Sequence, residues 1–280
     1  MILKRNVSLV NKIVLVDGQG RSGKSLLGPV LGSFDSVEVE RIEALYENIA
    51  LLDNLGKIDR DAAVQLLQLR TDQLLYESMI SRNTNFRFGD HSSIFNTHRK
   101  WHYLKNIFSK EGQIVVDKIQ KQQPIFQVIT HDILSMNEPF FEAFDNKLRV
   151  FQMLRHPATL LYSWYNRGWG RRLTEDPRSF SMTFESESGE ILPWYTVEKF
   201  PKLSEVNRIV QMVSNISEKA YKSYCSLTAS QKEQVCWIIF EDFATDPEPD
   251  IIRIEKFLDT KRTKYTKKQL KKANCPRVFD

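Results

Sequence analysis

The chain has 280 residues, 41% of them hydrophobic, which is enough apolar material for the core of one large α/β domain. Its first dozen residues are too short and too polar for a signal peptide, and no run of about 18 or more apolar residues follows. The sequence therefore predicts a soluble, cytoplasmic protein without a membrane span. The three cysteines are odd in number and lack C-x-x-C spacing, which argues against a disulfide framework and against structural zinc.

The net charge of +5 comes from the C-terminal segment. Residues 261–279 hold eight Lys or Arg and no acidic residue. Such a segment could meet an anionic ligand, nucleic acid or an acidic membrane surface, but a lysine-rich helix face is more often only solvated. We therefore expect no nucleic-acid partner, and we expect any functional cation of the basic segment 261–280 to lie close to a nucleotide site.

The first part of the chain predicts one strand followed by helices. Residues 12–18 form a short apolar run that is typical of a buried strand, and a glycine-rich turn and the apolar segment 25–34 predict a helix directly after it. Residues 36–54 and 59–80 have the apolar spacing of helices. These elements are expected to form a strand, a phosphate loop and a helical layer.

The middle of the chain predicts three more strands, at residues 113–119, 124–133 and 147–157. A proline at the end of the last strand is well placed for the first turn of a helix over residues 158–169. Strands that alternate with helices indicate a mostly parallel sheet with both faces covered.

Residues 173–200 lack a periodic pattern, which predicts a long functional loop or lid. A helix is expected over residues 203–224, a buried strand at 235–240 and a further helix at 249–258. The predicted fold class is a P-loop-containing, three-layer α/β/α fold with a mostly parallel central sheet, and residues 1–280 are predicted to form a single domain.

Residues 18–25 form a G-x-x-x-x-G-K-S motif between the first predicted strand and its helix. The glycines allow the backbone to approach a phosphate, the helix directs its positive end at the same place, and Lys24 adds a full charge. By itself this motif also predicts an ATP- and magnesium-dependent small-molecule kinase, with Ser25 on the metal and Asp117 as a second metal carboxylate.

Two further segments narrow the prediction. In LRHPATLLYSW, Arg155 and Ser163 are separated by eight residues across a strand-to-helix turn, so both could hold one terminal phosphate. The segment IIFEDFATDPEPDIIRIEKFL contains an apolar strand, an acidic turn and a helix. Together with GRSGKSLL in the phosphate loop, these segments resemble the sulfotransferases that depend on 3′-phosphoadenosine 5′-phosphosulfate (PAPS). Lys24 departs from the family's loop, because it replaces the first of two hydroxyl residues.

The resemblance implies a sulfuryl transfer from PAPS to a hydroxyl group of an acceptor, with adenosine 3′,5′-bisphosphate (PAP) as product and no metal. It assigns Arg155 and Ser163 to the 3′-phosphate. It assigns the 5′-phosphosulfate to the loop residues Gly20, Arg21, Ser22, Gly23, Lys24, Ser25 and Leu26. The aromatic residues near positions 86–103 favour a carbohydrate acceptor. The family's basic C-terminal loop usually contains a glycine, which the basic segment lacks.

The attacking hydroxyl group needs a base, and His131 is the first candidate because imidazole can accept a proton near pH 7. The family's cytosolic branch has a Thr-His dipeptide at the corresponding strand, which Thr130 and His131 match. The glycan-modifying branch uses a carboxylate, so Asp117 is the alternate base. Arg21 and Lys24 are expected to stabilise the charge that develops on the leaving group.

Two alternatives remain beside this interpretation. One is the magnesium-dependent kinase. The other is a nucleotide- or nucleic-acid-binding module without catalysis, with the basic segment as its contact. His98 and His102 have the i, i+4 spacing of a helical metal pair, but no further ligand cluster accompanies them, so no metal site is expected. The sequence does not predict the oligomeric state.

Overall fold

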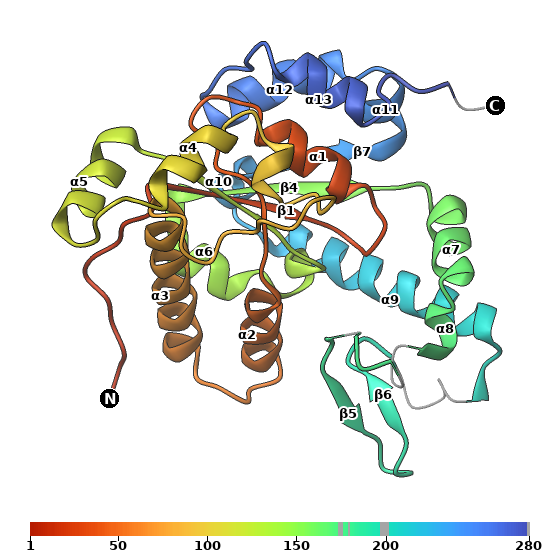
Figure 1. Ribbon diagram of the computed structural model, residues 1–280. Helices are drawn as coiled ribbons and strands as arrows, with labels where there is room; N and C mark the ends of the chain where they lie inside the picture. The colour runs from red at the N-terminus through yellow and green to blue at the C-terminus, as the bar shows by residue number, and fades with distance from the viewer. Residues whose placement is uncertain (173–175, 179, 197–201, 279–280) are drawn as a thin grey trace.

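A parallel sheet of five strands forms the centre of the computed structural model, which describes residues 1–172, 176–178, 180–196 and 202–278 (Figure 1). In spatial order the strands are β2 (Arg41–Ile42), β3 (Ile125–Ile129), β1 (Lys12–Asp17), β4 (Leu148–Leu154) and β7 (Val235–Ile239). All neighbouring pairs are parallel, with Val14 opposite both Gln127 and Arg149. The carboxyl ends of the strands therefore meet at one edge, where open α/β sheets bind ligands.

Helices cover both faces of the sheet, as the predicted three-layer fold requires (Figure 1). Along β1, Ile13 and Leu15 point into one core cluster, and Val14 and Val16 into the other, because successive side chains of a strand alternate between faces. The first cluster is closed by α2 (Ala44–Asn54), α3 (Arg60–Met79), α5 (Gln113–Gln122) and α6 (Glu138–Phe144). The second is closed by α1 (Lys24–Leu31), α11 (Phe240–Thr245), α12 (Glu248–Leu258) and α13 (Thr266–Lys272).

A third apolar cluster lies beside the sheet and includes Leu160, Trp164, Leu192 and Ile209. It joins α7 (Pro157–Asn166), the long α9 (Glu205–Ser226) and a hairpin of β5 (Thr183–Glu185) and β6 (Ile191–Pro193). The short α8 (Trp169–Arg172) lies between α7 and this hairpin in the chain. The remaining elements are α4 (Lys100–Asn106), α10 (Ala229–Glu233) and the 3₁₀ turns η1 (Ile94–Asn96), η2 (Ile133–Met136) and η3 (Asp145–Lys147).

The strand predicted at residues 113–119 is wrong, because this segment is the helix α5. Its buried residues, Val115 and Ile119, are four positions apart, whereas Asp117 between them is exposed. That spacing is helical, and the β-branched run concealed it. The helix predicted over 36–54 begins only at Ala44, because the preceding residues are mainly extended and include β2.

The predicted lid segment contains more regular structure than its sequence suggested. Within residues 173–200, β5 and β6 form an antiparallel hairpin, whereas residues 173–175, 179 and 197–200 lie outside the described residues. In the described part of the chain, no helix combines the length and apolar character needed to cross a membrane.

Candidate active site

The glycine-rich loop connects the end of β1 to the start of α1, and its tight packing explains its glycines. Gly18 has a φ of 133°, and a Cβ atom there would lie 2.5 Å from the backbone oxygen of Met153. Gly23 has a φ of 111°, and a Cβ atom there would lie 2.4 Å from the ring of Phe240. Only glycine meets both requirements without strain. The loop is therefore fixed against β4 and α11.

Inside the loop, the structure separates the side chains that the sequence had grouped together. Lys24 is buried, and its Nζ donates hydrogen bonds to the backbone oxygens of Gly18 and, at 3.0 Å, Gln19. Burial lowers the pKa of Lys24, although the nearby carboxylate of Asp132 opposes that shift. Ser22 is buried as well. Ser25 is exposed in the first turn of α1, where backbone N–H groups have no partner inside the helix.

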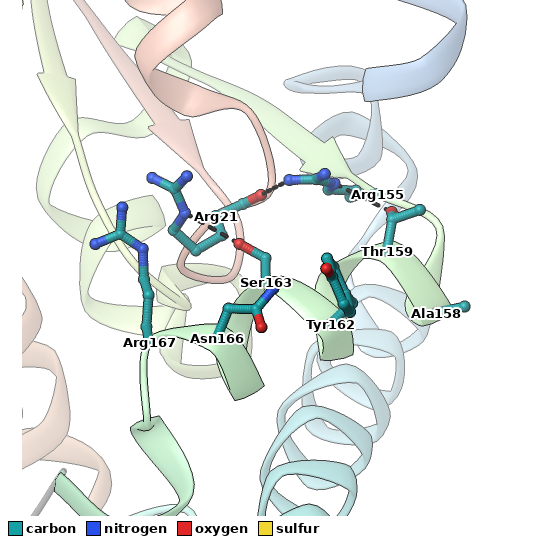
Figure 2. Close-up of a pocket in the computed structure, with 8 residues that line it drawn as sticks. All are labelled: Arg21, Arg155, Ala158, Thr159, Tyr162, Ser163, Asn166 and Arg167. Atoms are coloured by element: carbon teal, nitrogen blue, oxygen red, sulfur yellow. Dashed lines mark hydrogen bonds between the residues drawn. The ribbon is translucent and has the colours of Figure 1, made fainter. Parts of the chain in front are cut away.

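Arg21, Arg155 and Ser163, from two segments that are far apart in the sequence, line one cleft (Figure 2). The Arg21 Nε donates to the hydroxyl of Ser163 at 3.2 Å. The Arg155 guanidinium donates to the backbone oxygen of Arg21 at 2.9 Å and to the hydroxyl of Thr159 at 3.1 Å. The cleft has a volume of about 770 Å³ and is also lined by Ala158, Tyr162, Asn166 and Arg167.

The electrostatics of this cleft fit an anion. Its lining residues include three arginines and, within the described part of the chain, no carboxylate. Burial lowers the pKa of Arg21, and the positive charges of Arg167 and Arg155 lower it further. Like charges held together repel each other, and a phosphate group would relieve that repulsion. Glu241, at the border of the cleft, accepts hydrogen bonds from the backbone N–H of His156 and from the hydroxyl of Thr159, at 3.1 and 3.3 Å.

His131 lies just after β3 and next to the phosphate loop. A Cβ atom at Gly20 would lie 4.0 Å from the His131 ring. One carboxylate oxygen of Glu47, on α2, accepts hydrogen bonds from both the backbone N–H and the Nδ1 of His131, each at 2.9 Å. In a neutral ring, an Nδ1–H bonded in this way leaves Nε2 as the proton acceptor. Glu47 therefore orients the ring of His131.

Asp17 holds the turn that carries His131. Its buried carboxylate accepts hydrogen bonds from the hydroxyl of Thr130 and from the backbone N–H groups of Ile133 and Leu134, all at 3.0 Å. Asp132 adopts a left-handed conformation in the same turn, and burial raises its pKa well above the usual range. A buried carboxylate with several donors is a rigid anchor. The turn is therefore well placed to keep His131 beside the loop.

A second pocket, with a volume of about 320 Å³, opens between His131 and the residues that precede β5 and follow β6. Trp164 forms part of its wall, and the indole Nε1 of Trp164 donates to the backbone oxygen of Gly20 at 2.8 Å. The pocket is also lined by Ile42, Ala44, Glu47, Asn48, Leu51, Asp132, Met136, Trp169, Arg172, Asp176, Arg178, Phe180, Ser181, Met182, Trp194 and Tyr195. We call it the aromatic pocket. It touches the glycine-rich loop at Gly20, so a ligand in the pocket would lie next to that loop.

Asp117 belongs to neither cavity. It lies on the exposed side of α5, and its carboxylate accepts a hydrogen bond from Gln113 at 2.9 Å. Figure 1 shows α5 and α7 on opposite sides of the molecule. The two roles considered for Asp117, a metal carboxylate and the alternate base, both required a strand that ends beside the loop. Because the segment is a helix elsewhere in the fold, both roles are wrong.

Sequence reasoning missed Glu47, Asp17 and Arg167. Glu47 comes 84 positions before His131 in the chain and lies in an ordinary amphipathic helix, so no local pattern marks it.

One cation of the basic segment lies near the cleft, because the guanidinium groups of Arg277 and Arg155 lie 5.6 and 4.8 Å from the ring centroid of Phe240. Within the described residues, no cluster of His, Cys, Asp and Glu could hold a metal ion.

The fold and the two cavities define a P-loop α/β protein with an arginine-lined cleft and a separate pocket. The sequence model of the sulfotransferase domain family matches residues 64–275. Since this match spans well over half of the chain, the protein belongs to that family, and it is a sulfotransferase. The match begins after the phosphate loop, so it gives no evidence for the role of the loop, which has to be argued from the loop's geometry.

Solved structures support the same fold. The sulfotransferase domain from the curacin biosynthetic pathway superposes with a TM-score of 0.52 at 12% identity, covering 93% of this chain and 77% of that chain. The sulfotransferase domain of the Synechococcus PCC 7002 olefin synthase gives 0.50 at 12% identity, covering 100% and 82%. A comparison with curated protein sequences finds no match. At such low identity these structures establish the shared fold alone.

Proposed function

We propose that this sulfotransferase uses PAPS as its donor and transfers the sulfuryl group to a hydroxyl group of an acceptor in the aromatic pocket. The observation that carries the proposal is the contact between Arg21 and Ser163, at 3.2 Å. It joins the phosphate loop to the Arg155 and Ser163 pair in one cationic cleft. A donor with phosphate groups on both its 5′ and 3′ positions would occupy such a cleft.

In this proposal the loop binds the 5′-phosphosulfate and the start of α7 binds the 3′-phosphate. The N–H groups at the N-terminus of α1 and the guanidinium of Arg21 face the first group. Arg155 and Ser163 hold the second. The remaining loop residues, Gly20, Ser22, Gly23, Lys24, Ser25 and Leu26, shape the loop around the phosphosulfate. The magnesium-dependent alternative loses its support, because its metal carboxylate, Asp117, lies elsewhere.

At sulfur, the proposed reaction forms one bond and breaks one. The acceptor oxygen attacks sulfur, a new S–O bond forms, and the S–O bond to the 5′-phosphate breaks, so that its electron pair leaves on PAP. Negative charge grows on the 5′-phosphate, where Arg21 and the loop N–H groups stabilise it. The positive charge of Lys24, held inside the loop, acts on the same group.

The acceptor's proton passes to Nε2 of His131. Because Glu47 binds Nδ1–H, the imidazolium that forms is paired with a carboxylate, as in other catalytic dyads that orient a histidine. We assign His131 as the base and Glu47 as the residue that positions it.

A carbohydrate is the proposed acceptor class. Trp164, Trp169 and Trp194 contribute apolar rings to the lining, and Glu47 and Asn48 contribute hydrogen-bonding groups to the same pocket. A sugar ring uses both kinds of surface. A screen with PAPS should compare sugars with apolar alcohols of similar size. Turnover limited to apolar alcohols would replace the carbohydrate proposal and leave the donor assignment intact.

The donor proposal is tested by calorimetric titration with PAP in EDTA, with ADP as the control nucleotide. We expect PAP to bind more tightly than ADP without metal. Loss of a charged hydrogen-bond donor costs about 1.5–3 kcal/mol, so the Arg155→Ala substitution should weaken PAP binding by about 10- to 100-fold. Equal or tighter binding of ADP, especially with magnesium, would refute the donor assignment.

A further inference from the structure

Arg167 is a third arginine of the cleft that neither the sequence motifs nor the family resemblance assigns. It follows the last residue of α7, and its side chain is exposed. Neighbouring arginines of this region have carboxylate partners: Arg171 lies 3.8 Å from Glu205, and Arg172 is paired with Asp176. Among the described residues, no carboxylate pairs with Arg167. Its charge is therefore available to a ligand.

The spacing along α7 places Arg167 with the proposed 3′-phosphate ligands. Arg155, Thr159, Ser163 and Arg167 follow one another at intervals of four residues. Because residues four apart share one face of a helix, they form a polar stripe that begins just before α7 and ends just after it. All four line the same cleft. Two hydroxyl groups thus lie between two guanidinium groups.

Figure 2 shows how the ends of this stripe are arranged. The guanidinium groups of Arg21 and Arg167 extend side by side, and Arg155 approaches from the other side of Ser163. Apart from burial, the charge of Arg167 is the largest cause that lowers the pKa of Arg21. Arg155 and Arg167 are thus the two cations of the cleft that are not assigned to the 5′-phosphosulfate, and Ser163 lies between them in the stripe. Two guanidinium groups on one face suit a group with more than one negative charge, and a terminal phosphate is such a group.

We propose that Arg167 is a ligand of the donor's 3′-phosphate, which it binds together with Arg155 and Ser163. This inference depends on the proposed function, since it takes PAPS as the donor. Arg167 then supplies, from the end of α7, a cation that increases the preference for a nucleotide phosphorylated at the 3′ position. A guanidinium can donate two parallel hydrogen bonds to one phosphate, so a lysine would replace it only in part.

The test is calorimetric titration of the full chain with PAP and with ADP. Both nucleotides carry two phosphates, but only PAP has one at the 3′ position. The variants are Arg167→Ala, Arg167→Lys and the control Arg171→Ala, which removes an arginine one turn away that is paired with Glu205. Thermal unfolding of each variant verifies that it is folded.

We expect Arg167→Ala to weaken PAP binding by about tenfold or more and to change ADP binding by less than about twofold. Arg167→Lys should lose less, and Arg171→Ala should bind both nucleotides as the parent protein does. Unchanged PAP binding, or equal losses for PAP and ADP, would overturn the assignment of Arg167. If the parent protein itself fails to prefer PAP, the donor assignment fails, and the two failures are thereby distinguished.

Discussion

The contact between Glu47 and His131 gives the two side chains different roles in the proposed proton transfer. His131 touches the aromatic pocket and its Nε2 can receive the proton, whereas Glu47 binds the opposite nitrogen and the backbone N–H. A carboxylate in this position stabilises the protonated ring and fixes the tautomer. Removal of either side chain should therefore affect turnover in a different way.

We expect His131→Ala to lower kcat by about 10² or more, because the proton acceptor is lost, while PAP affinity stays within about twofold. Glu47→Gln should retain a hydrogen bond but lose the negative charge, so its kcat should fall less and its pH–rate profile should change in shape. Steady-state kinetics across pH, with PAP titration, measure both effects. Asp117→Asn, on the exposed side of α5, is the control and should leave kcat unchanged.

An unaltered pH–rate profile in Glu47→Gln, with a normal kcat, would show that Glu47 has no positioning role. A loss of PAP affinity in His131→Ala would show that His131 binds the donor rather than activates the acceptor.

The sequence predicts His131 as a candidate because a histidine that directly follows a strand is a local pattern. The sequence does not predict the role of Glu47, because Glu47 and His131 become neighbours only when α2 packs against the edge of the sheet.

At the scale of elements, the phosphate loop owes its shape to the strand and helix that confine it. Gly23 combines a positive φ with a position so close to the ring of Phe240 that an added Cβ atom would collide with it. Phe240 begins α11, and its ring also lies against the guanidinium of Arg155. A distortion at Gly23 should therefore reach both halves of the cleft.

We expect Gly23→Ala to destabilise the fold by about 1–3 kcal/mol, from the left-handed backbone alone, and to weaken PAP binding. Gly32→Ala is the matched control, because Gly32 has a φ of −63° and a Cβ atom there would meet nothing closer than 3.6 Å. Chemical denaturation and PAP titration provide the measurements. Similar values for the two variants would mean that the loop tolerates a different backbone.

The elements themselves differ in how far their sequences predict them. The strands β1, β4 and β7 were predicted because each is a short apolar run with a turn after it, and a buried parallel strand needs little else. The segment of α5 was predicted as a strand because IVVDKI is rich in β-branched residues. In a strand, every second side chain would be buried, and in a helix every third or fourth. The sequence of this short segment fits both patterns, and only its packing against the sheet distinguishes them. The β5–β6 hairpin lacks a strong local pattern, and much of its environment comes from α7 and α9.

The stability of the whole molecule should depend on pH through a carboxyl group outside the proposed reaction. Glu40 is 3% exposed, and a Cβ atom at Gly28 of α1 would collide with its carboxylate, which shows how closely the two segments pack. Burial raises the pKa of Glu40 to about 8. Unfolding returns this group to water, where its pKa is lower.

Between the unfolded pKa, near 4.5, and about 8, the folded protein holds a proton on Glu40 that the unfolded chain has lost. The stabilisation is complete below the lower value and is lost as pH rises toward the upper one, by at most about 1.4 kcal/mol per pH unit. Glu40→Gln lacks this titration. We therefore expect the free energy of unfolding of the variant, relative to the parent protein, to increase between pH 5 and pH 8.

Urea denaturation of both proteins at several pH values measures this difference. An identical pH dependence would mean that Glu40 is solvated or ionised in the folded protein. The three-layer fold that buries this residue followed from the alternation of strands and helices. The individual charged contacts of the fold could not be predicted, because the order of the strands in the sheet brings together residues that are remote in sequence.

Different segments of the chain line the two cavities. The described residues between Trp169 and Tyr195 supply much of the wall of the aromatic pocket, yet they contribute no strand to the central sheet. The cleft proposed to bind the donor is built from the phosphate loop and α7, which come before this stretch. If the aromatic pocket binds the acceptor, as proposed, an exchange of this stretch between relatives would change the acceptor and keep the donor, so acceptor preference could diversify in evolution without rebuilding the cleft.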